Sequence, residues 1–259
     1  MMRPSAHATT ISATTARTMT SRTRLMRGCG SACLDIRMTG LPSRAIRAAT
    51  GVFPNEARHP VEYLIRHYTL EQGALEIEYI EEFFGEFARR KASSEITGRL
   101  ADREHLIVMA VAALPDDPGS LAPVAYKVCH ELFANEHDPR LADLAAQLED
   151  VVEFDDRRVL YSWIGGTRVD WRGQGQFRAL TEEQEAWAVG AGFDEVIVKT
   201  KNRHYEMRGT LANLHFNVIK YVQNPIENLE SKVFLSKQLG PHVLDLHRSA
   251  RTRLEDGRR

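Results

Sequence analysis

Cysteine is scarce in this chain. Only Cys29, Cys33 and Cys129 occur among 259 residues. Such a count supports neither a disulfide framework nor a complete zinc site, because structural zinc is usually held by four ligands. We therefore expect no metal centre, and a reducing compartment, which favours the cytoplasm.

Long hydrophobic runs and an excess of charge of one sign are also lacking. The longest apolar run, HLIVMAVAAL at residues 105–114, falls well short of the roughly 18 residues that a membrane span needs. The formal net charge of −1 gives the whole molecule no attraction to nucleic acid or to an anionic membrane. The composition is 43% hydrophobic, which is enough to bury a substantial core.

Acidic residues are nearly missing from residues 1–50. Asp35 stands alone against eight arginines, which are interspersed with Ser, Thr and Ala. Because so little apolar surface offsets the entropy of ordering, we predict that residues 1–50 form a disordered extension. The same composition is typical of an organelle transit peptide, which would change the location, and of a nucleic-acid-binding arm. Met19, Met26 and Met38 leave open a third alternative, a later translation start.

Hydrophobic periodicity predicts the elements that follow. A strand is expected over residues 61–68, and apolar residues at helical spacing predict an amphipathic helix next to it, capped by Thr69 with Gln72. The helix stripe consists of Ala74, Ile77, Ile80, Phe84 and Phe87. Two further strands, 105–114 and 123–133, flank the turn sequence PDDPGS, which favours an antiparallel pair.

The second half of the domain continues this mixture of strands and helices. Strand 157–166 leads through a glycine loop into a helix over residues 177–193, whose expected buried stripe is Phe177, Leu180, Trp187 and Ala191. The next elements are a strand at 195–200, a helix that turns into a strand within 206–222, and a strand at 231–237. We predict one α/β domain over residues 51–240 with a mixed, mostly antiparallel sheet flanked by helices. Residues 241–259 are expected to be a tail that forms a frayed helix or a loose end.

The glycine loop lies in the stretch WRGQGQFRAL, residues 171–180. A tight glycine turn between a strand and a helix points several backbone N–H groups and the positive end of the helix at one place, which suits a phosphate. Arg172 and Arg178 add charge-assisted hydrogen bonds to the same anion. A Walker loop is disfavoured because no Lys-Ser/Thr pair follows, and a dinucleotide fingerprint would need glycine at position 178, which is Arg.

These stretches together resemble the GCN5-related N-acetyltransferase (GNAT) superfamily. WRGQGQFRAL looks like its acyl-CoA loop, SWIGGTRVDW like the strand before the loop, and EVIVKTKNRHYEM like the later strand and its asparagine turn. The resemblance implies a GNAT-like fold in which the fourth and fifth strands splay apart around acyl-CoA. It also implies that acetyl-CoA is the co-substrate.

The resemblance implies roles for particular residues. Gly166 and Thr167 would meet the pantetheine arm, and Asn202 would lie near its amide. A backbone N–H at the same strand end would polarise the thioester carbonyl, as in other acyl transfers. The diphosphate would be held by the loop residues Arg172, Gly173, Gln174, Gly175, Phe177 and Arg178.

Two positions depart from the superfamily pattern. Phe177 replaces a small residue, and its ring would either turn into the core or fill the wedge between the strands. The position of the tyrosine that often protonates the leaving thiolate is Leu211, and the Gly-Phe pair that follows it is His215-Phe216. A thiol with a pKa near 8.5 can leave as thiolate without a dedicated acid, so the missing tyrosine changes the mechanism more than the reaction.

Candidates for the chemistry are few. Glu131, at the end of the third strand, and Tyr161 with Ser162, on the fourth, are the polar residues expected to face the wedge, with Glu131 and Tyr161 as catalytic candidates. Each also has a plain structural explanation. His130 and His215 lack partners at the spacing of a triad or metal site and are expected to be structural.

The sequence therefore predicts an acyl-CoA-dependent N-acetyltransferase. Acetyl would pass from acetyl-CoA to a primary amine of a small molecule or protein by direct attack in a ternary complex, because no nucleophile with base and orienting group is evident. The alternative is a non-catalytic GNAT-like module that binds acyl-CoA or a protein. RNA-linked acylation guided by the arginine-rich extension is a further alternative.

Overall fold

The computed structural model describes residues 62–71, 74–83, 91–114 and 117–256. The predictions for the extension 1–50, for Cys29 and Cys33, and for Gln72, Phe84 and Phe87 lie outside these residues. In the described part, no helix is both long and apolar enough to cross a membrane. No group of three or more His, Cys, Asp or Glu side chains that could hold a metal ion occurs among the described residues.

A single seven-stranded sheet organises the chain, in the order β1-β2-β3-β4-β5-β7-β6. All neighbouring strands are antiparallel except β4 and β5, which are parallel. The predicted mixed, mostly antiparallel sheet is confirmed. The elements are β1 (Leu64–Tyr68), α1 (Ala74–Phe83), α2 (Ser93–Leu100), β2 (His105–Leu114), β3 (Asp117–Leu132), α3 (Pro139–Ala146), β4 (Val159–Thr167), α4 (Gln176–Gly190), β5 (Glu195–Lys201), α5 (Tyr205–Asn213), β6 (Asn217–Val222), β7 (Lys232–Gln238) and α6 (Pro241–Asp256), with short 3₁₀ turns at Val169–Trp171 and Asn228–Glu230.

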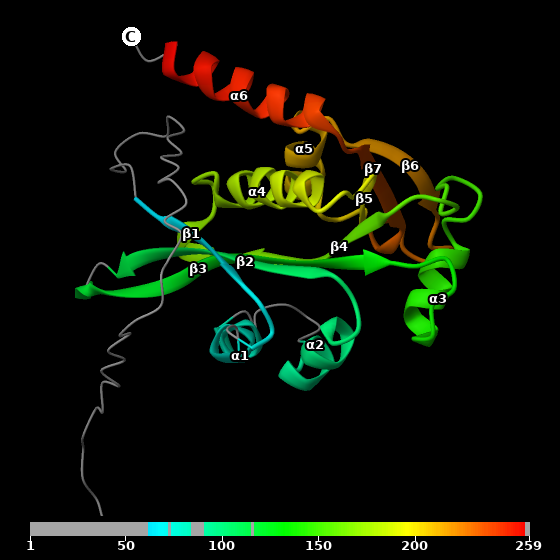
Figure 1. The fold of residues 1–259 in the computed structure, drawn as a ribbon, viewed down its shortest axis with the longest axis horizontal. Coiled ribbons are helices and arrows are strands. Elements are labelled where there is room, and N and C mark those ends of the chain that lie inside the picture. The colour runs from blue at the N-terminus through cyan, green and yellow to red at the C-terminus, as the bar shows by residue number, and fades with distance from the viewer. Residues whose placement is uncertain (1–61, 72–73, 84–90, 115–116, 257–259) are drawn as a thin grey trace, which may run out of the picture. The chain divides into compact units, whose positions relative to one another are not determined.

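Helices cover both faces of the sheet, as Figure 1 shows, with α1 and α2 on one side and α4 and α5 on the other. On the first side Ile80 of α1 and Leu100 of α2 pack on Met109 of β2. On the other side Leu180 of α4 and Leu211 of α5 join a larger apolar cluster. This layering follows from the strand sequences, which are apolar on both faces because both are buried.

The parallel pair β4 and β5 holds together over only part of its length. Pairing runs from Val159↔Glu195 to Ser162↔Val198 and then stops, although β4 continues to Thr167 and β5 to Lys201. The two strands therefore separate after Ser162 and leave a wedge with unpaired backbone edges on either side. The predicted splay of the fourth and fifth strands is confirmed.

Two short helices, α2 and α3, are missing from the sequence-based prediction. The sequence of α2, SSEITGRL, carries Gly98 and β-branched residues that lower helix propensity, so only Ile96 and Leu100 indicate a buried face. In α3 a proline follows Asp138, whose carboxylate caps the helix by accepting from the backbone N–H groups of Arg140 and Leu141. Both helices owe their stability to tertiary packing rather than to a long periodic pattern.

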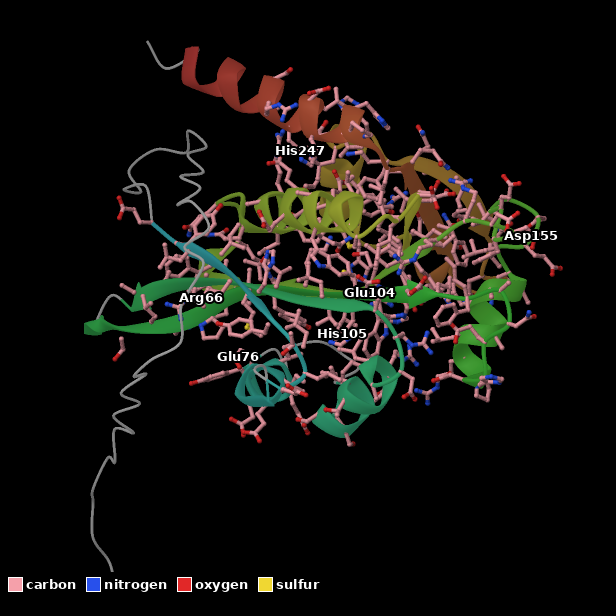
Figure 2. The ribbon with its side chains drawn as sticks, in the orientation of Figure 1. Arg66, Glu76, Glu104, His105, Asp155 and His247 are labelled. Atoms are coloured by element: carbon pink, nitrogen blue, oxygen red, sulfur yellow. The ribbon has the colours of Figure 1, made fainter. Side chains whose placement is uncertain are left out.

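The predicted tail includes a helix that packs on the domain. In α6, Val243 is fully buried, and His247 lies between α6 and α4 (Figure 2). The Glu185 carboxylate of α4 lies 2.7 Å from His247 Nε2 and accepts a hydrogen bond of 2.6 Å from Lys237 Nζ. The start of residues 241–259 is therefore not a loose end, because it shares a buried polar cluster with α4 and β7.

Arg158, just before β4, forms hydrogen bonds with three segments of the domain. Its guanidinium donates to both oxygens of Glu131 (2.9 and 3.0 Å), to Glu104 (2.6 Å) and to the carbonyl of Ala191 (2.6 Å). The same group lies 4.3 Å from the ring centre of Phe193. Hydrogen bonds to the two carboxylates raise the pKa of Arg158, first through Glu131. The start of β2, the end of β3 and the end of α4 are thus held at one point.

We expect replacement of Arg158 by methionine to lower the free energy of unfolding by about 2 kcal/mol, because two carboxylates and a carbonyl lose charge-assisted partners. Urea denaturation measures this loss. Arg140→Met removes an exposed arginine that pairs with Glu95 and should change stability by less than about 0.5 kcal/mol. Equal losses in the two variants would contradict the central role of Arg158.

Candidate functional site

The loop between β4 and α4 is built around two glycines in left-handed conformations. Gly173 has φ +75° and Gly175, the residue that caps α4, has φ +85°. L-residues with side chains rarely adopt this region, so both glycines are required by the backbone path. A 3₁₀ turn at Val169–Trp171 precedes them, and the buried Trp171 anchors that turn in the core.

Six successive amides of this loop are available to a ligand. Within the described part of the chain, the backbone N–H groups of residues 173–178 have no hydrogen-bond acceptor. The last three open the 15-residue helix α4, where such groups have no partner inside the helix. They add to the positive end of the helix dipole, so the loop is suited to an anion.

The polar side chains of the loop lie close to its backbone. Arg172 Nε donates to the carbonyl of Thr167 at 3.2 Å, and Gln174 Nε2 makes a long contact of 3.5 Å with the carbonyl of Asp170. Arg178 donates to Glu182 one turn along α4 at 2.9 Å. Arg172 thereby links the loop to the end of β4, whereas Arg178 is shared with a carboxylate.

The ring of Phe177 packs beneath α4. It packs, partly buried, against the apolar cluster under α4. The ammonium of Lys127 on β3 lies 4.9 Å from the ring centre. The Phe177 N–H remains among the unpaired amides, so the large side chain at this position leaves the loop open.

The part of β4 that no longer pairs with β5 contains Gly166 and Thr167. Both lie beyond Ser162, the last β4 residue that pairs with β5, and they still pair with β3 through Tyr126 and Ala125. Alternate backbone groups of a strand point to its two neighbours, so part of this segment presents N–H and C=O groups to the wedge. These groups can bind an extended amide-containing chain.

A bulge marks the point where the wedge opens. Val128 pairs with Ile164 but Cys129 pairs with Ser162, which leaves Trp163 as an extra residue in β4. A bulge of this kind bends a strand and increases its twist, which accounts for the departure of β4 from β5. On the other strand, Asn202 follows the end of β5, and its side chain donates to the carbonyl of Asn228 at 3.2 Å.

Glu131 lies elsewhere than expected. It pairs across the sheet with Leu160, at a level where β4 and β5 are still joined, and both its carboxylate oxygens accept from Arg158. The expectation that Glu131 faces the wedge is therefore wrong. The ion pair with Arg158 explains why a carboxylate is present at this strand end.

Tyr161 and Ser162 are neighbours on β4 and point to opposite faces. Tyr161 is buried in the cluster on the α3 side, with its ring 5.5 Å from that of His130, and burial raises its pKa to about 12. Ser162 donates to Gln184 of α4 at 2.9 Å. Only one of the two side chains can therefore face a given side of the wedge. Among the described residues, neither hydroxyl donates to a carboxylate or an imidazole that would make it a base.

The polar residues that α4 buries next to the site were not predicted from the hydrophobic periodicity of the sequence. The buried face of α4 is largely polar, whereas Phe177, Trp187 and Ala191 of the predicted stripe are only partly buried. The buried polar residues of α4 could not be recognised from hydrophobic periodicity, because that pattern assigns Gln, Thr and Glu to the exposed face of a helix. The buried residues of α4 are Gln176, Leu180, Thr181, Glu182, Gln184, Glu185 and Ala188.

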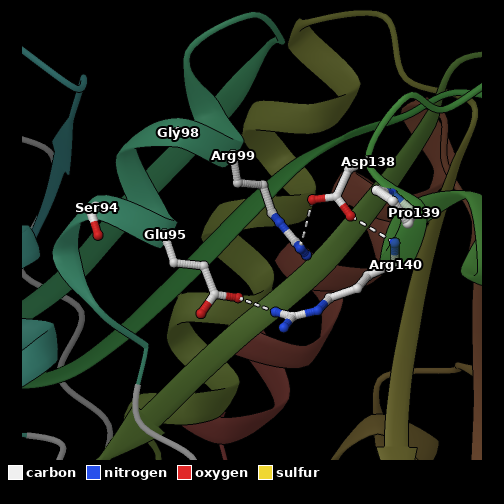
Figure 3. A pocket seen from close by; sticks show the side chains of 7 residues that line it. All are labelled: Ser94, Glu95, Gly98, Arg99, Asp138, Pro139 and Arg140. Atoms are coloured by element: carbon white, nitrogen blue, oxygen red, sulfur yellow. Dashed lines mark hydrogen bonds and ion pairs between the residues drawn. The ribbon is translucent and has the colours of Figure 1, made fainter.

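A cavity of about 370 Å³ lies between α2 and the start of α3 (Figure 3). Arg99 pairs with Asp138 (3.2 Å), and Arg140 pairs with Glu95 (3.1 Å). The charged side chains that line the cavity therefore neutralise one another. The guanidinium of Arg99 also stacks 4.3 Å from the ring centre of Trp163. Arg99 therefore connects this cavity to the bulge at the opening of the wedge. The lining residues are Ser94, Glu95, Gly98, Arg99, Asp138, Pro139 and Arg140.

No protein-family model matches the chain, and no curated protein matches its sequence. Solved structures do match its fold. NAA60 of Arabidopsis thaliana, in complex with a bisubstrate analogue, has a TM-score of 0.52 at 13% identity, over 67% of this chain and 97% of that chain. A GNAT superfamily phosphinothricin acetyltransferase from Sinorhizobium meliloti, in complex with acetyl-CoA, covers 69% of this chain and 89% of its own, at 14% identity and a TM-score of 0.49. The chain has the GNAT fold.

The GNAT fold accounts for the region of the chain that is packed around the sheet. NAA60 in complex with acetyl-CoA matches with the same TM-score, 0.52, at 12% identity, over 68% of this chain and 98% of that chain. Almost the whole of each NAA60 chain is therefore reproduced in the architecture described above. At such identity the similarity concerns the fold alone.

The close approach of β4 to β3 gives a test of the wedge geometry. A Cβ at Gly165 would lie 3.0 Å from the Tyr126 carbonyl oxygen and 3.1 Å from Lys127 Cγ. Gly165→Ala should therefore cost about 1 to 3 kcal/mol of stability through overpacking. Gly209→Ala in α5, where nothing lies within 4 Å, should stabilise by up to about 1 kcal/mol. Thermal unfolding of both variants checks the pair; a neutral Gly165→Ala would show that the strands are less tightly joined.

Proposed function

We propose that this protein is an acyl-CoA-dependent N-acetyltransferase that passes acetyl from acetyl-CoA to a primary amine. The observation that carries the proposal is the set of six unpartnered amides at residues 173–178, at the head of α4 and beside a splayed parallel pair. A diphosphate satisfies such amides, and an extended pantetheine arm fits between unpaired strand edges.

Different residues of this chain would bind different parts of acetyl-CoA. The loop amides, with Arg172 beside them, would hold the diphosphate, and the free part of β4 at Gly166 and Thr167 would hold the pantetheine amides. Asn202, at the opposite edge of the wedge, would contribute from β5. The fold that this chain shares with NAA60, whose structure in complex with acetyl-CoA is among the matches, supports the proposal in general.

In the chemical step the protein has to hold the two substrates in position and to provide N–H groups for the oxyanion. The neutral amine nitrogen attacks the thioester carbon and gives up one proton to solvent water. The carbon–sulfur bond breaks, and CoA leaves as thiolate, which takes up a proton from solvent. Backbone N–H groups at the bulge of β4 can stabilise the developing oxyanion. Holding both substrates in one complex supplies most of the acceleration, which suits a site without a nucleophile.

A sensor of acyl-CoA remains the second candidate, and one observation favours it. The position where many members of the superfamily carry the tyrosine acid is Leu211, which is fully buried in the core. Tyr161 does not replace that tyrosine, because its ring lies against His130 on the α3 side of the sheet. A sensor would bind acetyl-CoA without turnover.

Calorimetric titration tests the binding site. The wild-type protein should bind acetyl-CoA, and Gly175→Ala should weaken binding about tenfold, because alanine disfavours φ +85° and tilts the loop amides. Gly192→Ala is the matched control: Gly192 has φ +79° at the other end of α4, so it should lose similar stability and keep its affinity. No binding by the wild type at millimolar acetyl-CoA would refute the proposal.

Turnover separates the enzyme from the sensor. Incubation with acetyl-CoA and a panel of primary amines, both small molecules and peptides with free N-termini, should release free thiol and yield an acetylated product. Thiol release should follow the binding losses of the glycine variants, because both depend on the same loop. Tight binding with no amine-dependent thiol release across the panel would favour the sensor.

A further inference from the structure

A buried lysine lies between the sheet and the first turns of α4. Lys127 of β3 is 2% exposed. Its ammonium donates to Thr181 Oγ1 at 2.9 Å and lies 4.9 Å from the centre of the Phe177 ring. Among the residues that the structure describes, no carboxylate oxygen lies within 4 Å of it. A buried ammonium without a carboxylate is costly, and proteins seldom tolerate it without a reason.

The surroundings of Lys127 are poor in negative charge. The layer under α4 also contains Lys237, and the nearest fully buried carboxylate, Glu185, is already engaged by Lys237 and His247. Glu182 of α4 accepts from Arg178 instead. Glu185 is thus the carboxylate partner of Lys237 and not of Lys127. Burial lowers the pKa of Lys127 to about 8, partly opposed by Cys129 on the same strand and by Glu185.

Lys127 is joined to the loop by a short chain of hydrogen bonds. Its ammonium donates to the Thr181 hydroxyl, which in turn donates to the backbone carbonyl of Phe177 at 2.7 Å. The peptide N–H of the same Phe177 is one of the free amides of the loop. Across the sheet Lys127 pairs with Gly165, directly before the wedge residues. Lys127 is therefore placed beneath the loop, close to both parts of the site.

We propose that Lys127 is a positioning residue whose ammonium is the internal counter-charge for the anion held by loop 173–178, so that binding is coupled to proton uptake at its amine. This inference rests on the proposed function, since the anion in question is the diphosphate of acyl-CoA. The missing carboxylate partner is supplied by the ligand. In the free protein the amine loses its proton more easily, and in the complex it retains it.

The sign of the coupling follows from linkage. An anion raises the pKa of a nearby ammonium, so the bound protein carries more protons than the free protein between the two pKa values. Below about pH 7 both forms are protonated and no proton is taken up. With a free pKa of about 8 and a bound pKa about one unit higher, roughly half a proton is taken up per site at about pH 8.5. Acetyl-CoA affinity should then fall about fivefold from about pH 7 to about pH 9.

The experiment is calorimetric titration of the full chain with acetyl-CoA, whose thiol is blocked, in buffers of different ionisation enthalpy at pH 8.5. The slope of the observed enthalpy against the buffer enthalpy counts the protons. Lys127→Met keeps the shape of the buried side chain and removes the amine. It should take up no proton, bind several-fold more weakly at pH 7, and show a flat affinity between pH 7 and pH 9.

Lys199→Met is the matched control. Lys199 is a second lysine whose pKa is lowered by burial, and it faces the ring of Phe234 on the opposite side of the sheet. Its variant should retain the proton uptake of the wild type. Thermal unfolding of Lys127→Met, which we expect to be as stable as the wild type or more so, shows that the comparison concerns a folded protein.

The outcomes separate the two proposals. Wild-type binding with no proton uptake, or equal uptake in Lys127→Met, would overturn the role of Lys127 and leave the acetyltransferase proposal intact. Absence of acetyl-CoA binding in the wild type would overturn both. Uptake that disappears only in Lys127→Met supports the counter-charge.

Discussion

The end of pairing between β4 and β5 after Ser162 and Val198 is the constraint on which the rest of this structure depends. A continuous parallel pair would bury every backbone group and leave no site. The extra residue Trp163 turns β4 away, and the sequence on either side is adapted to that departure. Gly165 allows β4 to stay close to β3 while it leaves β5, and the glycine loop then brings the chain back into α4.

Much of this arrangement could be predicted from the sequence, because it depends on local signals. The strands carry continuous apolar runs, and the left-handed turns at Gly173 and Gly175 need the residue type that occurs there. The separation of the fourth and fifth strands was predicted from the resemblance of the loop to an acyl-CoA motif, because local sequence patterns do not indicate it. Short α2 and α3 were missed because their helical state depends on packing.

The site residues that could not be predicted are those whose meaning depends on a distant partner. Glu131 has the chemistry of a base, but Arg158, 27 positions later, holds it as an ion pair. Phe177 was ambiguous until the position of its ring was known. The underside of α4 looked solvent-exposed in sequence, since glutamine, threonine and glutamate are usually on the surface. Their partners come from β3, β4, β7 and α6, which no helical pattern reveals.

The cluster around Glu185 also bears on the order in which the chain folds. Its partners Lys237 and His247 follow it by 52 and 62 residues. Contacts of such separation close long loops, and that entropic cost is offset only after the intervening strands have paired. Until then Glu185 lacks both of its hydrogen-bond partners on the inner face of α4, which disfavours early docking onto an incomplete sheet. Glu185 thus makes completion of the C-terminal strands and of α6 a condition for closing the helix that bears the glycine loop.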